Sequence, residues 1–76
     1  MNKIEIDYQM KKLEEAIRLL ELIQQANRRI DGLYELINGI GGHFKSLKEG
    51  YLKQIEITEF AKERLITRYN NLLNKQ

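Results

Sequence analysis

Apolar residues recur every three or four positions in two long segments of the chain, and a glycine-rich stretch separates the segments. The first segment carries the series Ile6, Met10, Leu13, Ile17, Leu20, Ile23, Ala26, Ile30, Leu33 and Ile37. The second segment carries the series Phe44, Leu47, Tyr51, Ile55, Thr58, Ala61, Leu65, Tyr69 and Leu72. Such spacing places the apolar side chains on one side of an α-helix. The pattern predicts an all-α fold in which two long helices form an antiparallel hairpin.

Local signals set the expected limits of these helices. Asp7 can accept a hydrogen bond from an amide of a first helical turn, which is typical of a helix N-cap. Asn38 and Gly39 are typical of a helix C-terminus, because glycine readily adopts the left-handed conformation found there. The expected elements are a helix over about residues 7–37, a glycine turn over residues 38–43 and a helix over about residues 44–73, within a single domain of residues 1–76.

Two glycines inside the helical segments leave an alternative open. A glycine within a helix costs about 1 kcal/mol relative to alanine, so Gly32 or Gly50 can mark a kink or a break. The β-branched residues between Ile55 and Thr58 also weaken helix propensity, and Thr58 can cap a separate last helix. The second choice is therefore a three-helix layout. A break at Gly32 or Gly50 can also fold the chain back on itself into a compact monomer of three or four helices.

The two helices carry more apolar residues than a single contact between them can cover. Each helix of a hairpin buries one stripe of the other, whereas apolar residues of the first helix spread over a wider arc. Burying a side chain of this size is worth about 1.5–3 kcal/mol. We therefore expect the hairpin to complete a helical bundle, either by self-association into a homodimer or higher oligomer or by docking on another protein. The residues expected to face the partner are Leu19, Leu22, Leu36, Leu52, Ile57 and Phe60.

Length and composition limit the classes of protein that remain. A chain of 76 residues buries only about 60% of its unfolded surface, which again favours a partner. The chain has no cysteine, which excludes disulfide and thiolate chemistry and fits a reducing, cytoplasmic location. Its N-terminal residues lack the apolar core of a signal peptide, and no apolar run approaches the roughly 18 residues of a membrane span. We expect no membrane association.

The glycine-rich stretch raises the question of an anion site. Backbone amides at a helix start, together with a lysine, can hold a phosphate, and the candidate residues are Gly41, Gly42, His43 and Lys45. The spacing does not match the phosphate loop G-x-x-x-x-G-K-[ST], and no strand precedes it. Reversal of the chain explains the same glycines, so we favour a turn over anion binding.

The sequence offers no complete catalytic or metal-binding set. His43 is the single histidine, whereas a zinc site needs three or four ligands. Ser46 follows His43 by one helical turn, but no acidic residue nearby can orient the pair for acyl transfer. We expect a protein that is not an enzyme and that needs no metal or cofactor.

The charges are nearly balanced, with a formal net charge of +2. Residues 1–38 carry six basic and seven acidic groups, whereas residues 39–76 carry seven basic and four acidic groups. Acidic residues interleave with the basic ones in the second segment, where a duplex-binding helix presents a cleaner basic stripe. A nucleic-acid- or nucleotide-binding regulator that uses the basic second half and the glycine turn is therefore an alternative, but not the favoured one.

Two long helices joined by a short glycine turn resemble the small secreted WXG100 hairpins and their relatives. The resemblance is one of shape, because the turn reads Asn38-Gly39-Ile40-Gly41-Gly42 in place of Trp-x-Gly and no tyrosine is followed four residues later by Asp or Glu. It implies a secreted helical hairpin or a secretion chaperone as a further alternative.

The favoured interpretation is a helical hairpin that binds proteins and catalyses no reaction. Such a protein acts by occupying the surface of a partner, as a small adaptor or inhibitor. Its small size also fits an origin in a phage or another mobile element.

Overall fold

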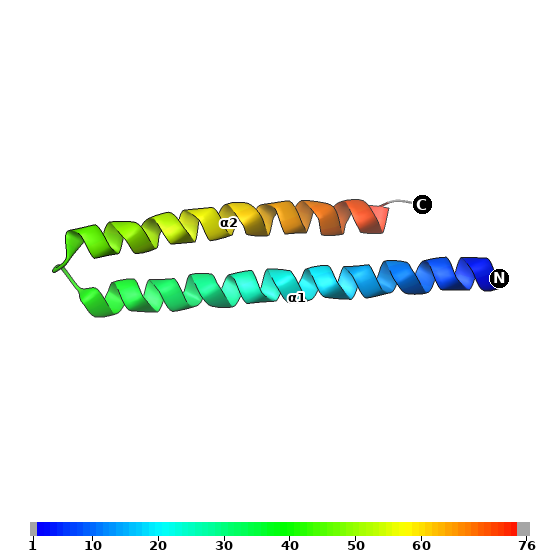
Figure 1. Cartoon of the computed structure of the whole chain (residues 1–76), viewed down its shortest axis with the longest axis horizontal. Helices are drawn as coiled ribbons and strands as arrows, with labels where there is room; N and C mark the ends of the chain where they lie inside the picture. Colours follow the sequence, from blue (N-terminus) through cyan, green and yellow to red (C-terminus); the bar gives the residue numbers. More distant parts are fainter. Residues whose placement is uncertain (1, 75–76) are drawn as a thin grey trace.

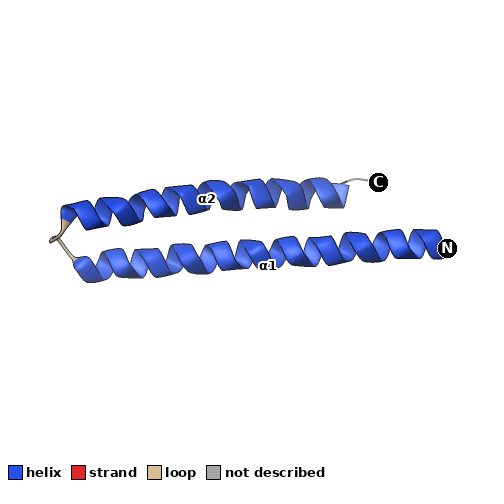
Figure 2. Ribbon diagram, in the orientation of Figure 1, coloured by secondary structure: helices blue, strands red, loops and turns tan. Residues whose placement is uncertain are grey.

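The chain forms an antiparallel hairpin of two long helices in a computed structural model that describes residues 2–74 (Figure 1). Helix α1 spans Lys3–Ile40 and helix α2 spans Lys45–Asn74. Figure 2 shows that a short loop joins the helices at one end and that they run side by side from there. At the other end, called the open end below, α1 projects beyond α2. The expected all-α hairpin is confirmed.

Helix α1 begins four residues earlier than Asp7, the expected N-cap. Asn2 caps the helix instead, because its side-chain Oδ1 accepts a hydrogen bond from the backbone N–H of Glu5 at 2.9 Å. The N–H of Ile6 donates to the carbonyl of Asn2 at 3.1 Å and closes the first turn. An Asn followed three residues later by Glu is a recognised helix-start pattern, so the sequence did contain this signal.

The internal glycines do not break the helices. Gly32 and Gly39 lie within α1, and Gly50 lies within α2. Thr58 is no cap either, because its hydroxyl donates to the carbonyl of Gln54, one turn earlier in the same helix, at 2.7 Å. The alternative of three helices is therefore wrong. Packing along the whole hairpin offsets the roughly 1 kcal/mol that each internal glycine costs.

The chain reverses over residues 41–44, later than the expected turn. Gly41 ends α1 with φ 69° and ψ −142°, a backbone conformation that residues with a Cβ atom rarely adopt. Phe44, immediately before α2, also has a positive φ of 60°. Its carbonyl accepts a hydrogen bond from the N–H of Lys48 at 3.1 Å, so the first turn of α2 is closed.

The contact between the helices follows a strict alternation of four- and three-residue steps. In α1 the buried and half-buried residues are Lys12, Ala16, Leu19, Ile23, Ala26, Ile30, Leu33, Ile37 and Ile40. In α2 they are Tyr51, Ile55, Thr58, Lys62, Leu65, Tyr69 and Leu72, with Ile66 beside them. This seven-residue repeat is typical of helices that stay in contact along their length. We call these two series the seam.

The seam differs from the predicted series at the open end of α1. The two coincide from Ile23 to Ile37, but the structure steps back by four to Leu19, whereas the prediction steps back by three to Leu20. Repeated steps of three would overwind the contact, and the four–three alternation keeps α1 against α2. In α2, Lys62 occupies the seam in place of the predicted Ala61, and Phe44 and Leu47 are exposed.

The hairpin is a thin rod whose Cα atoms extend over 63 × 16 × 11 Å. Its radius of gyration is 18.0 Å, whereas a compact domain of this length has about 11 Å. The best-buried cluster, Ile30, Ile37 and Ile55 with Leu33 and Tyr51 packed against it, lies in the half of the rod nearer the turn. Two broad faces therefore remain, one on each side of the seam.

Candidate interaction surfaces

The hairpin exposes more accessible surface than a compact protein of the same mass does. Its accessible area is 6463 Å², whereas a folded monomer of its 9.1 kDa mass exposes about 4,900 Å². Among the described residues, no large side chain is buried completely. Exposed apolar residues are unremarkable singly, but a contiguous group of them is typical of a binding surface.

One such group lies on α1 toward the open end. It consists of Ile6, Met10, Leu13, Ile17 and Leu20, which we call the stripe. These residues repeat the four–three spacing of the seam one position further along the chain, so they form a second row beside it. Leu13 and Ile17, in the middle of the stripe, are 59% and 56% exposed. The sequence pattern predicts these five residues in the seam, and the structure places them in solvent.

Helix α2 adds to the same broad face. Ile66 is half-buried and Leu73 is exposed, and their seven-residue spacing puts them in one row on the stripe side of the seam. The surface also has a shallow hollow bordered by Ile17, Leu20 and Ile23, which continues the apolar region toward the middle of α1. We call this side of the hairpin the stripe face.

Carboxylates border the stripe. Asp7, Glu14 and Glu21 are exposed and follow one another at seven-residue intervals, each within one turn of a stripe residue. On α2, Glu63 lies one turn before Ile66, and Glu59 lies seven residues before it. Lys3, seven residues before Met10, places one basic residue at the N-terminal end of the stripe. The stripe is thus edged by negative charge along α1 and at the end nearer the turn.

The opposite broad face, called the basic face, has a different character. Arg68 of α2 forms an ion pair with Glu15 of α1 at 3.6 Å, and Arg29 donates to the side-chain oxygen of Gln54 at 3.5 Å. Both pairs cross the seam on this side. The ion-paired side chains are 65% and 50% exposed, so solvent screens them and the pair contributes little stability.

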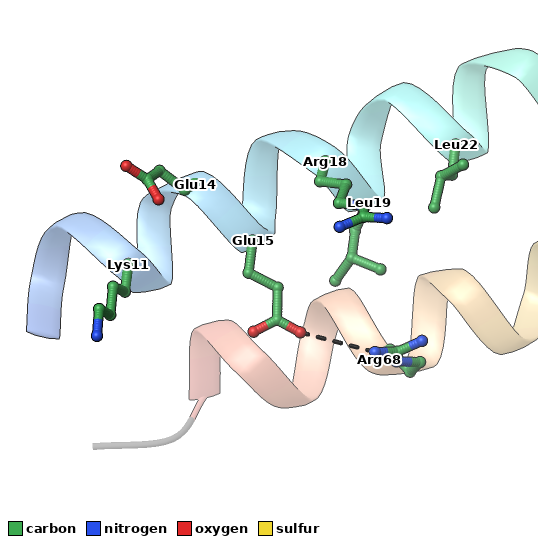
Figure 3. Close-up of a pocket in the computed structure, with 7 residues that line it drawn as sticks. All are labelled: Lys11, Glu14, Glu15, Arg18, Leu19, Leu22 and Arg68. Atoms are coloured by element: carbon green, nitrogen blue, oxygen red, sulfur yellow. Dashed lines mark ion pairs between the residues drawn. The ribbon is translucent and has the colours of Figure 1, made fainter.

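A hollow near the open end gathers basic side chains on this face (Figure 3). Lys11 and Arg18 of α1 and Arg68 of α2 border it, with Glu14 and Glu15 among them, and Leu19 and Leu22 form its apolar wall. Arg29 and Arg64 extend the positive charge along the same side. Basic residues thus predominate on this face, but Glu14 and Glu15 border the same hollow, and Glu14 also borders the stripe.

The six residues predicted to face a partner do not form one surface. Leu19 is 3% exposed and lies in the seam, so it packs inside the hairpin. Leu22 and Ile57 border one groove of the basic face, and Leu36 lies in the same row as Leu22 nearer the turn. Leu52 shares the row of Ile66 on the stripe face, and Phe60 projects from the outer side of α2 beside Arg64.

The predicted anion-binding residues lie together at the tip of the hairpin. Gly41, Gly42 and His43 belong to the turn, and Lys45 begins α2. All four residues are exposed. The tip also presents Phe44, the most exposed aromatic side chain of the described residues, at 74%.

Residues 2–74 hold neither a cluster of metal-ligating side chains nor a membrane-spanning helix. Three or more His, Cys, Asp or Glu side chains nowhere come together there in a way that could hold a metal ion. Neither helix has a stretch apolar enough, over sufficient length, to cross a membrane within this described part. A comparison with protein-family models, with curated proteins and with solved structures finds no match to this chain.

Proposed function

We propose that this hairpin is a non-enzymatic protein–protein interaction module that acts by occupying the surface of a partner, as an adaptor or inhibitor. The observation that carries the proposal is the stripe: five large apolar side chains in one row, all exposed. Burial of each side chain on a partner would contribute up to about 1.5–3 kcal/mol. Such a row costs solubility unless something covers it.

The shape of the molecule supports the same function. Over residues 2–74 the hairpin is a rod only two helices wide and its hollows are open to solvent, whereas a substrate pocket normally encloses most of its ligand. Two long helices do present extended faces, and a further helix or helix pair can pack on them to complete a bundle. A second copy of the chain or a different protein can supply those helices.

The first test uses the purified full chain. If the stripe stays exposed, we expect the protein to bind the dye ANS strongly. If a second copy covers the stripe, we expect the mass measured by light scattering to increase with concentration. Ile17→Ser combined with Leu20→Ser should reduce both signals, while circular dichroism shows unchanged helix content. A monomer at all concentrations that binds no ANS would contradict the proposal.

The basic face favours a second candidate function, nucleic-acid binding. The hollows on this face are lined by more basic than acidic residues: Lys11, Arg18, Arg29, Arg64 and Arg68 against Glu14, Glu15 and Glu63. Binding of a fluorescent oligonucleotide should then weaken steeply with salt, with a logarithmic slope of about −0.7 to −0.9 per phosphate contacted. Arg18→Glu should weaken this binding, and Lys53→Glu, on the outer side of α2, serves as the control. Absent or salt-independent binding would rule this candidate out.

A further inference from the structure

We propose that the stripe face docks an amphipathic helix whose apolar side is bordered by lysine or arginine. The inference rests on the proposed function as an interaction module and specifies the chemistry of the partner. It places the partner on the open half of the hairpin, against α1 and the end of α2.

The shape of the stripe fits a helix. Ile6 and Leu20 are fourteen positions apart, so the stripe is about 21 Å long at a rise of about 1.5 Å per residue. Its four–three spacing is the spacing by which one α-helix contacts another. Ile66 and Leu73 provide a second apolar row on α2, so an added helix would contact both helices and form a three-helix bundle.

The charges bordering the stripe select the partner. Asp7, Glu14 and Glu21 form one row along the outer edge of the stripe, and Glu59 and Glu63 lie at the end nearer the turn. Glu14 and Glu63 lie far enough out on their helices to border hollows of the basic face as well. A helix docked on the stripe would bring the residues beside its own apolar side against these carboxylates. Lysine or arginine at those positions gives attraction, and acidic residues give repulsion. The stripe face is therefore complementary to a basic amphipathic helix.

The same charges disfavour a second copy as the occupant. When two copies of the chain pack the same surface about a two-fold axis, each patch of one copy meets the equivalent patch of the other. The row of Asp7, Glu14 and Glu21 would then approach the same row of the other copy, where like charges repel. A different chain with basic residues avoids this repulsion, so we assign the stripe face to a foreign helix.

Two synthetic helical peptides test the inference directly. Both are about 18 residues long and carry leucine at alternating four–three spacing; one has lysine beside the leucines and the other has glutamate. Binding to the full-length protein is measured by fluorescence anisotropy. We expect the lysine peptide to bind and the glutamate peptide to bind at least about tenfold more weakly. The affinity for the lysine peptide should fall between about 0.1 M and about 1 M salt, because the Debye length shrinks from about 10 Å to about 3 Å.

Two matched pairs of variants locate the peptide on the hairpin. Ile17→Ser should weaken binding of the lysine peptide by about tenfold or more, whereas Leu36→Ser should leave it unchanged. Leu36 is a fair control because it is 51% exposed on the same helix but lies on the basic face. Glu14→Lys combined with Glu21→Lys should weaken the lysine peptide and strengthen the glutamate peptide. Glu35→Lys changes a carboxylate fourteen residues after Glu21, beyond the stripe, and should leave the affinity for both peptides unchanged.

Several results would overturn the inference. Equal binding of the two peptides would show that charge does not select the partner, while leaving the interaction module itself intact. Self-association that Ile17→Ser abolishes would identify a second copy as the occupant. Loss of peptide binding in Leu36→Ser but not in Ile17→Ser would place the partner on the basic face. If neither peptide binds and the protein also binds no ANS, the proposed function fails together with the inference.

Discussion

Leu19 and Leu20 are adjacent in the sequence but lie in opposite environments. Leu19 is 3% exposed between the helices, and Leu20 is 46% exposed on the stripe. Leu19→Ala should therefore lower the free energy of unfolding by about 2–4 kcal/mol, because it removes buried methyl groups and leaves a cavity. Leu20→Ala should cost less than about 1 kcal/mol. Urea unfolding followed by circular dichroism measures both changes.

This pair of variants also tests the alignment of the two helices. Both substitutions remove the same atoms from neighbouring positions of one helix, so their effects on helix propensity are the same. Each variant thus controls for the other. A larger loss of stability in Leu20→Ala would mean that the seam follows the series predicted from the sequence, with Leu20 inside and Leu19 in solvent.

At these positions the sequence predicted only part of the contact. The residues from Ile23 to Ile37 fit a single row, so the pattern identified them correctly. Nearer the open end, two rows of apolar residues lie side by side in α1. The contact with α2 can continue from Ile23 toward the N-terminus through Leu19 or through Leu20. The choice depends on α2, whose seam residues must meet those of α1 over many turns. Periodicity within one helix does not contain that information.

At the scale of a helix, the turn depends on one glycine more than on its neighbours. Gly41 has a φ of 69°, whereas Gly39 lies in α1, and a Cβ added at either position would meet open space. Gly41→Ala should lower the free energy of unfolding by about 1–3 kcal/mol through backbone strain. Gly39→Ala should raise it by up to about 1 kcal/mol, because alanine is the better helix former.

Thermal or urea unfolding of the two variants gives the comparison directly. Neither substitution creates a steric clash, so backbone conformation alone separates them. Stabilisation by Gly41→Ala would mean that the chain reverses elsewhere, as in the turn over residues 38–43 that the sequence predicts. The helix ends themselves were only partly predictable, since Asn2 and Asp7 are both good caps and the structure uses the first.

At the scale of the whole molecule, the extended shape distinguishes the hairpin from a collapsed bundle. Small-angle X-ray scattering of the monomer should give a radius of gyration close to 18.0 Å. A value near 11 Å would instead indicate a compact monomer, in which the chain folds back on itself. Dilution and a mass measurement on the same sample ensure that the monomer is observed. The two-helix architecture was predictable because no proline interrupts either segment. The grouping of Lys11 and Arg18 of α1 with Arg68 of α2 emerges only when both helices are placed.

The best-buried cluster of the hairpin lies near the turn, whereas the stripe lies near the open end. Stability is therefore graded along the rod. Ile30, Ile37 and Ile55 pack together in the turn half, whereas in the open half the large buried residue Leu19 is followed toward the N-terminus by the smaller Ala16 and the charged Lys12. Local unfolding should begin with separation of the helices at the open end and progress toward the turn. A helix that docks on the stripe would then stabilise the end of the hairpin that opens most easily.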